Sequence, residues 1–88
     1  MARAYIKLDH AEFDGGLGKD KLTMIIEFVG AEIPFGSDIA YGEILFDPGD
    51  PVSQLRPKVT QVVLLEAAAR GYVVAKQDMF IPVVQQGV

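Results

Sequence analysis

The chain has 88 residues, enough for one domain. Half of the residues are hydrophobic and 23% are charged, which is more apolar surface than so short a chain can bury alone, so a subunit interface is expected. The formal net charge of −4 disfavours nucleic-acid binding, and the absence of cysteine excludes disulfides, thiolate nucleophiles and thiolate metal sites.

Three strands are predicted in the first half, over residues 5–13, 22–29 and 40–46, from alternating apolar and polar residues. The segment 14–20 holds three glycines within four residues, which predicts a flexible hairpin loop, able to become ordered on a partner. Residues 22–29 are apolar on one face and half apolar on the other, which is typical of a central strand or of one covered on both faces. In the connection 30–38, Ile33 and Phe35 are expected to point inward.

The main helix is predicted to begin at Pro57, with Arg56 outside the helical region, and to end at Gly71. At 100° per residue its apolar side chains cover the full circle, and Glu66 and Arg70 are spaced to form an ion pair. Two interpretations stay open. Either the helix is about two-thirds buried and its alanines tolerate water, or its outer side meets a neighbouring subunit through Leu64, Leu65, Ala68 and Ala69.

A fourth strand is predicted over 72–79, and Phe80-Ile81-Pro82-Val83-Val84 follows it. Proline cannot donate to a strand ladder, so this apolar segment either folds back on the core or extends over a neighbour as an arm formed by residues 80–88. The sequence therefore predicts a single α+β domain, residues 1–88. It has a mainly antiparallel sheet of about four strands in the order β-β-β-α-β, with one helix packed on it.

No motif in the sequence strongly indicates a catalytic, cofactor-binding or metal-binding site. The glycines of 15–18 lack the spacing of a phosphate loop or a dinucleotide fingerprint. His10, Glu12 and Asp14 would share one face of a strand with Asp9 nearby, but no second histidine completes a usual metal site. A solvated strand end is preferred there, with a metal site as the lesser alternative. Asp47 and Asp50 fit a turn better than a calcium loop. We expect no metal, cofactor or catalytic residue.

The second half shows a resemblance. Phe46-Asp47-Pro48-Gly49-Asp50-Pro51, followed by the helix, Gly71-Tyr72-Val73-Val74 and Phe80-Ile81-Pro82, resembles small virion structural proteins of tailed bacteriophages. The resemblance covers about half of the chain, which shares their short, acidic, cysteine-free and β-rich character. It implies a multi-copy role in a capsid, connector or tail without catalysis, and no functional residue is carried over from it.

The sequence thus favours a non-enzymatic structural or assembly subunit that self-associates or decorates a larger complex. Its expected partners are copies of itself and other protein subunits, with no nucleic acid and no membrane. The alternative is a small-molecule-binding or regulatory module. No apolar run suits a signal peptide, so cytoplasmic synthesis is expected, with the virion as a final location if the resemblance holds. The expected contact residues are Leu64, Leu65, Ala68, Ala69, Phe80, Ile81, Val83 and Val84.

Overall fold

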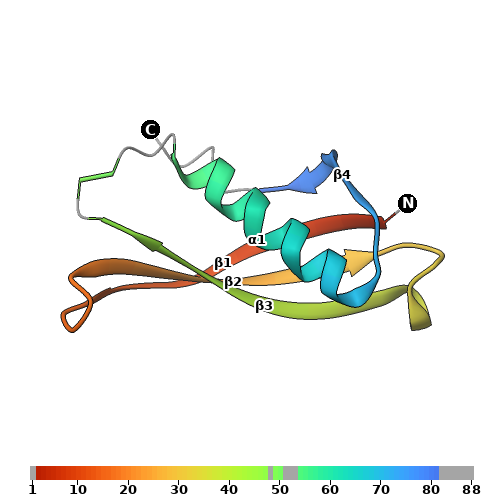
Figure 1. Ribbon diagram of the computed structural model, residues 1–88. Helices are drawn as coiled ribbons and strands as arrows, with labels where there is room; N and C mark the ends of the chain where they lie inside the picture. Colours follow the sequence, from red (N-terminus) through yellow and green to blue (C-terminus); the bar gives the residue numbers. More distant parts are fainter. Residues whose placement is uncertain (1, 48, 51–53, 82–88) are drawn as a thin grey trace.

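The computed structural model describes residues 2–47, 49–50 and 54–81. Its elements follow the predicted order, with a short 3-10 helix added between the second and third strands: β1 (Ala2–Asp14), β2 (Lys19–Val29), η1 (Pro34–Gly36), β3 (Ser37–Phe46), α1 (Leu55–Arg70) and β4 (Val74–Phe80). The chain is a single α+β domain with a four-stranded sheet and one helix packed on it, so the predicted fold class is confirmed (Figure 1).

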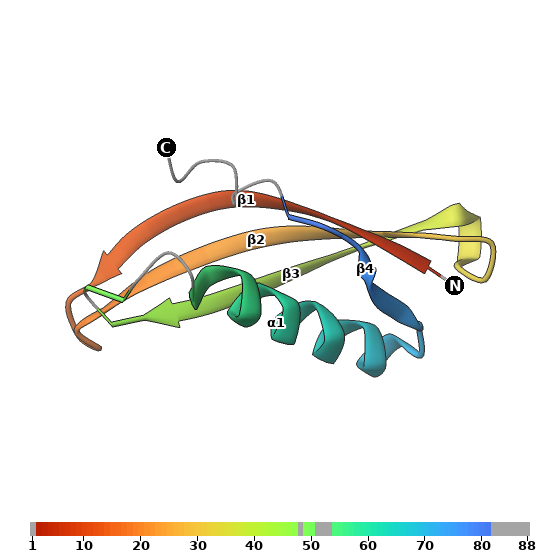
Figure 2. The ribbon, with the colours of Figure 1, turned by 90° about the horizontal axis from the view of Figure 1, so that it is seen from above.

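The sheet has the spatial order β3-β2-β1-β4. β1, β2 and β3 form an antiparallel meander, whereas β4 runs parallel to β1, so the sheet is mixed. The physical reason is the helix: α1 runs back across the sheet after β3, and the chain then re-enters in the direction shared by β3 and β1. Figure 2 shows α1 lying across one face of the curved strands.

The hydrophobic core lies between α1 and the sheet. The helix contributes Leu55, Val59, Val63 and Ala67, which follow each other at four-residue spacing and form one buried stripe. The strands contribute the side chains that alternate toward the helix, among them the fully buried Met24, Ile26 and Phe28. Gly42 of β3 lets the helix approach closely, because a Cβ there would lie 2.7 Å from Val62 Cγ1.

A β-bulge at Asp9 explains the imperfect alternation of β1. Leu8 pairs with Met24 and His10 pairs with Thr23, so Asp9 is an extra residue without a partner in β2. One extra residue exchanges the two faces of the strand beyond it. Ala11 therefore lies on the helix side, paired with Leu22, while His10 points to the opposite side.

The predicted start of the helix is wrong by two residues. α1 begins at Leu55, and Arg56 is helical although proline follows it. Pro57 is tolerated because the N–H groups of a first helical turn have no intrahelical acceptor, so its missing donor costs nothing. The predicted end is confirmed: Gly71 adopts φ 78°, and its N–H donates to the carbonyl of Ala68 at 3.1 Å.

The two loops that connect the antiparallel strands differ from expectation in one residue. The predicted hairpin between β1 and β2 is present, and Asp14 closes its turn by accepting hydrogen bonds from the N–H groups of Gly16 and Leu17 at 3.0 and 3.3 Å. In the next loop Ile33 is buried as predicted. Phe35, however, is fully exposed at φ 61°, because the η1 turn directs its side chain outward. Within the described ranges, no helix has the length and hydropathy required to cross a lipid bilayer.

Candidate interaction site

Four of the predicted contact residues form the outer side of α1, here called the helix ridge: Leu64, Leu65, Ala68 and Ala69. All four are exposed, and Leu65 keeps 61% of its surface in water. Their position follows from helical geometry, because the buried stripe of α1 faces the sheet and these residues project from the other side. The ridge is thus available to a partner, but half of it consists of alanine.

The first two residues of the predicted C-terminal arm have different surroundings in the structure. Phe80 belongs to β4 and lies exposed on the sheet. Ile81 is only 7% exposed and packs into the core of its own chain, so the expectation that it contacts a partner is corrected. Its burial fits the alternative in which this segment folds back. Val83 and Val84 lie outside the described residues, as does the remainder of the predicted arm.

A larger apolar surface, which the sequence analysis did not single out, lies on the side of the sheet opposite α1. We call it the open face; it consists of Tyr5, Ile25, Ile39, Tyr41, Leu45 and Phe80. No described element covers it (Figure 2). Among the aromatic residues of the open face, Tyr41 is the most exposed at 72%, followed by Phe80 at 47% and Tyr5 at 39%. The last two stack with their ring centroids 4.9 Å apart.

The signal for the open face was present in β2. Its second face, which begins Thr23-Ile25, is half apolar, which predicts either a central strand or a strand covered on both faces. The structure places β2 between β3 and β1, so the central position is confirmed. Among the described residues only the other face of the sheet is covered by a helix, so the half-apolar face remains in contact with water. The odd-numbered residues of β3 continue it outward, since Ile39 and Tyr41 point away from α1.

Around Tyr5, the basic and acidic side chains of the open face lie on different strands. Arg3 and Lys7 project from β1 on either side of Tyr5, and Glu27 projects from β2 beside Tyr5. All of these side chains are exposed. Within residues 2–47, 49–50 and 54–81, neither cation nor Glu27 forms an ion pair. Around Tyr5 the face therefore presents two unpaired cations on β1 next to an unpaired carboxylate on β2, whereas Lys21 and Glu43, farther along the same side, lie 3.7 Å apart and pair with each other.

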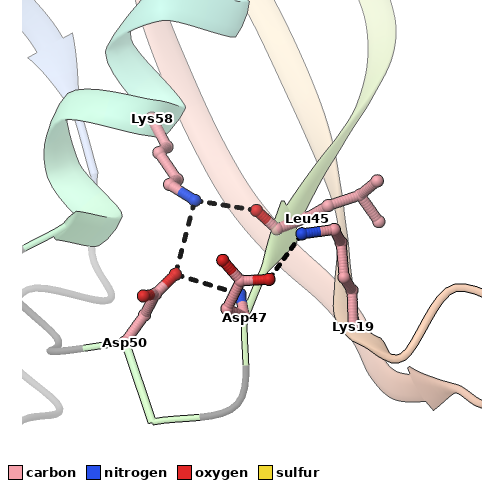
Figure 3. Close-up of polar contacts among 5 residues, drawn as sticks. All are labelled: Lys19, Leu45, Asp47, Asp50 and Lys58. Carbon is pink, nitrogen blue, oxygen red and sulfur yellow. Dashed lines mark hydrogen bonds and ion pairs between the residues drawn. The ribbon is translucent and has the colours of Figure 1, made fainter.

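Two polar clusters fasten the ends of α1 to the sheet. Figure 3 shows the first, where Lys58 donates to the carbonyl of Leu45 at 2.9 Å and lies 3.6 Å from Asp50. Asp47 accepts from Lys19 at the base of the hairpin, and its own N–H donates to Asp50 at 3.0 Å. The hydrogen bond and the charge of Lys19 lower the pKa of the Asp47 carboxyl. These contacts explain a structural role for the cluster.

The second cluster centres on Asp38 at the other end of α1. The hydroxyl of Tyr72 donates to Asp38 at 2.8 Å, and Arg70 lies 3.3 Å from the same carboxylate oxygen. Arg70 also pairs with Glu66 at 2.9 Å, as the four-residue spacing predicted. The hydrogen bond to Asp38 raises the pKa of Tyr72, with partial burial and the negative charge of Asp38 acting in the same direction.

The residues weighed as metal ligands do not converge. His10 Nε2 lies 3.6 Å from Glu12 Oε2, with both side chains more than half exposed, while the Asp14 carboxylate is engaged in the hairpin turn. In the described part of the chain, no three histidine or acidic side chains are arranged to hold a metal ion. No polar or charged side chain in this part is buried either.

A hollow of about 480 Å³ lies where the β1–β2 hairpin extends beyond the start of α1. It lies on the helix side of the sheet, at the end of the helix rather than beneath it. Its described lining combines apolar side chains with carboxylates and one lysine: Ala11, Glu12, Phe13, Asp20, Lys21, Leu22, Phe46, Asp47, Gly49, Asp50 and Leu55. Its size is within the range of small-molecule sites.

Comparisons with known proteins add no relative. No family model matches the chain, and neither the curated proteins nor the solved structures contain a significant match.

Proposed function

We propose that this protein is a non-enzymatic structural or assembly subunit that binds copies of itself and other protein subunits. The observation that carries the proposal is the open face, an exposed apolar surface on a sheet that has a helix on its other side only. Contiguous apolar patches of this kind mark protein interaction sites on small domains. The helix ridge offers a second apolar surface on the opposite side of the domain, which suits a subunit that contacts more than one neighbour.

The positions of the polar side chains support a role without catalysis. Catalytic acids, bases and nucleophiles are usually adjusted by burial and by neighbouring charges in a cleft. In the described ranges every charged side chain remains in contact with solvent, and the two polar clusters fasten secondary structure elements together. The resemblance of the second half to small virion proteins of tailed bacteriophages extends the proposal to a place in a capsid, connector or tail.

The test is the mass of the purified chain by light scattering at micromolar concentrations. We expect a species well above the 9.6 kDa of one chain. A chain that stays monomeric throughout this range, alone and in the presence of candidate partner subunits, would contradict the proposal.

A small-molecule-binding module is the second candidate, and the hollow beside the hairpin favours it. The apolar floor formed by Phe13, Phe46 and Leu55 can bury a hydrophobic ligand, while the aspartates supply polar contacts. A metabolite screen by thermal shift would detect such binding, because a ligand that binds only the folded state raises the melting temperature. A rise without any change in mass would favour this function over assembly.

A further inference from the structure

We propose that the occupant of the open face is the open face of a second copy, and that the two sheets pack as a sandwich with both helices outside. This inference rests on the proposed function and specifies its first contact. The contact is two-fold symmetric, with β1 of each copy lying over β2 of the other.

The size of the open face suits a stable dimer. Ten residues of β3 at about 3.3 Å per residue, and four strands about 4.8 Å apart, give a face of roughly 600 Å² before the relief of the side chains is counted. Stable interfaces bury about 600–1,000 Å² per partner, so the flat area of the face reaches the lower end of this range. From their exposed fractions, Tyr5, Tyr41 and Phe80 alone supply about 300 Å² of aromatic-residue surface. The face is therefore large enough to hold two copies together.

The composition of the open face favours it over the helix ridge as the contact between copies. Tyrosine, phenylalanine and isoleucine dominate it, and aromatic residues are enriched at the centres of protein interfaces. The stacking of Tyr5 on Phe80 fixes both rings before any partner arrives, which reduces the entropy lost on binding. The helix ridge has two leucines and two alanines, so it offers less apolar area for the same length of chain.

Two sheets can pack face to face around a two-fold axis that runs either perpendicular or parallel to the strands. The charges on the face favour the parallel axis. A two-fold axis perpendicular to the strands would place β1 over β1 of the second copy, bringing Arg3 and Lys7 near the same cations. An axis parallel to the strands instead places β1 over β2 of the second copy. In the sheet register Glu27 is level with Tyr5, and Arg3 and Lys7 lie two residues to either side, about 7 Å along the strand. Glu27 of the second copy then lies between Arg3 and Lys7, whose side chains are long enough to reach it.

The same axis places β4 over β3 of the second copy. Phe80 then faces the strand that carries Ile39 and Tyr41. Sheets that pack face to face lie about 10 Å apart, with their strands within about 30° of each other, and side chains of this size fill that gap. Tyr5 and Ile25 thus lie with the complementary charges on the two middle strands, and the apolar contacts of Phe80, Ile39 and Tyr41 lie on either side of them.

Charge reversal gives a direct test. Glu27→Lys makes the three unpaired charges around Tyr5 all positive, and the double variant Arg3→Glu/Lys7→Glu makes these three all negative. Each variant alone should associate at least about tenfold more weakly than the parent, because like charges then oppose each other across the interface. An equimolar mixture of the two should form a one-to-one heterodimer with twice the mass of one chain, detected by light scattering and native mass spectrometry. Added salt should weaken it.

Two further variants separate the contributions. Tyr41→Glu places a charge at the most exposed aromatic position of the open face and should give a monomer. Leu65→Glu makes the matched change on the helix ridge and should leave the dimer mass unchanged. All substituted positions are exposed, and circular dichroism of each variant checks that the fold is retained.

The outcomes distinguish this inference from the proposed function. A parent chain that is monomeric at every concentration overturns the inference, and it overturns the proposed function as well if the chain also stays monomeric with candidate partner subunits. A parent that associates, together with charge variants that associate equally well and a mixture that gains nothing, overturns the face-to-face arrangement and leaves self-association standing. Loss of association in Leu65→Glu but not in Tyr41→Glu would assign the contact between copies to the helix ridge and overturn the inference.

Discussion

Replacing Gly42 with alanine tests the close approach of α1 to the sheet. The new Cβ would lie 2.7 Å from Val62 Cγ1 and 3.4 Å from Met24 Cγ, and real Cβ contacts almost never reach the first distance. Valine in a helix has essentially one preferred rotamer, so Val62 cannot rotate away without cost. Overpacking of this kind costs about 1–3 kcal/mol. The reduced entropy of the unfolded chain returns about 0.4–1 kcal/mol, so we expect a net loss of about 1–2 kcal/mol.

The assay is thermal or urea denaturation followed by circular dichroism. For a domain of this size a loss of about 1–2 kcal/mol lowers the melting temperature by roughly 4–16 °C. Parent and variants must be compared at equal chain concentration, because association with a second copy stabilises the folded state by mass action. Gly15→Ala is the matched control. It has no atom within 4 Å of the added Cβ, so we expect no loss of stability and a gain of up to about 1 kcal/mol from the reduced entropy of the unfolded chain.

A double-mutant cycle identifies the cause. Val62→Ala in the parent should cost about 1 kcal/mol, because Val62 is only partly buried. In the Gly42→Ala background the same substitution should cost less or restore stability, since it removes the methyl group that the new Cβ meets. The expected coupling energy is about 1–2 kcal/mol. A Gly42→Ala protein that melts with the parent, or a Val62→Ala cost that is equal in both backgrounds, would refute the reasoning.

Three further substitutions test the clusters and the cap at the ends of α1. Asp47→Asn should destabilise the fold at neutral pH, because the contact with Lys19 stabilises only the carboxylate and lowers the pKa of Asp47. The difference in stability between parent and variant should vanish as the pH falls below about 4. If the stability of parent and variant falls identically on acidification, the result argues against this contact. Tyr72→Phe should remove a stabilisation that is present below a pH of about 10 and lost as the pH rises further, because the bond to Asp38 raises the pKa of Tyr72. Alkaline denaturation curves of parent and variant should therefore converge at high pH. Gly71→Ala should cost about 1–2 kcal/mol in chemical denaturation, because the residue adopts φ 78°, and an unchanged midpoint would count against a role for the left-handed cap.

The order of elements was predictable because each element has a strong local signal. Glycines mark the hairpin, alternation marks the strands, and Gly71 ends the helix. The parallel placement of β4 was not predictable from these signals, because residues 74–80 read the same whether β1 runs with them or against them. The direction depends on the path of α1 across the sheet, which is a property of the whole chain.

The candidate site was predictable only in part, because periodicity shows which residues share a face but not which face is covered. The helix ridge was identified from the angular distribution of its residues. The open face was missed because a half-apolar second face in β2 is compatible with either one covering layer or two. The β-bulge at Asp9 was also missed, although the broken alternation of Tyr5 to Phe13 was its visible trace. Where sequence patterns were ambiguous, tertiary packing decided the outcome.

The pairing of β4 with β1 has a consequence for synthesis on the ribosome. β1 leaves the exit tunnel before β4, so it acquires its second neighbour only when residues 74–80 have followed. Until then the nascent meander has a free edge on β1 and lacks the helix that shields Met24, Ile26 and Phe28 from water. Pairing between strands that lie far apart in the sequence forms slowly, and it leaves aggregation-prone intermediates exposed. Aggregation of the growing chain is therefore most favoured before β4 emerges.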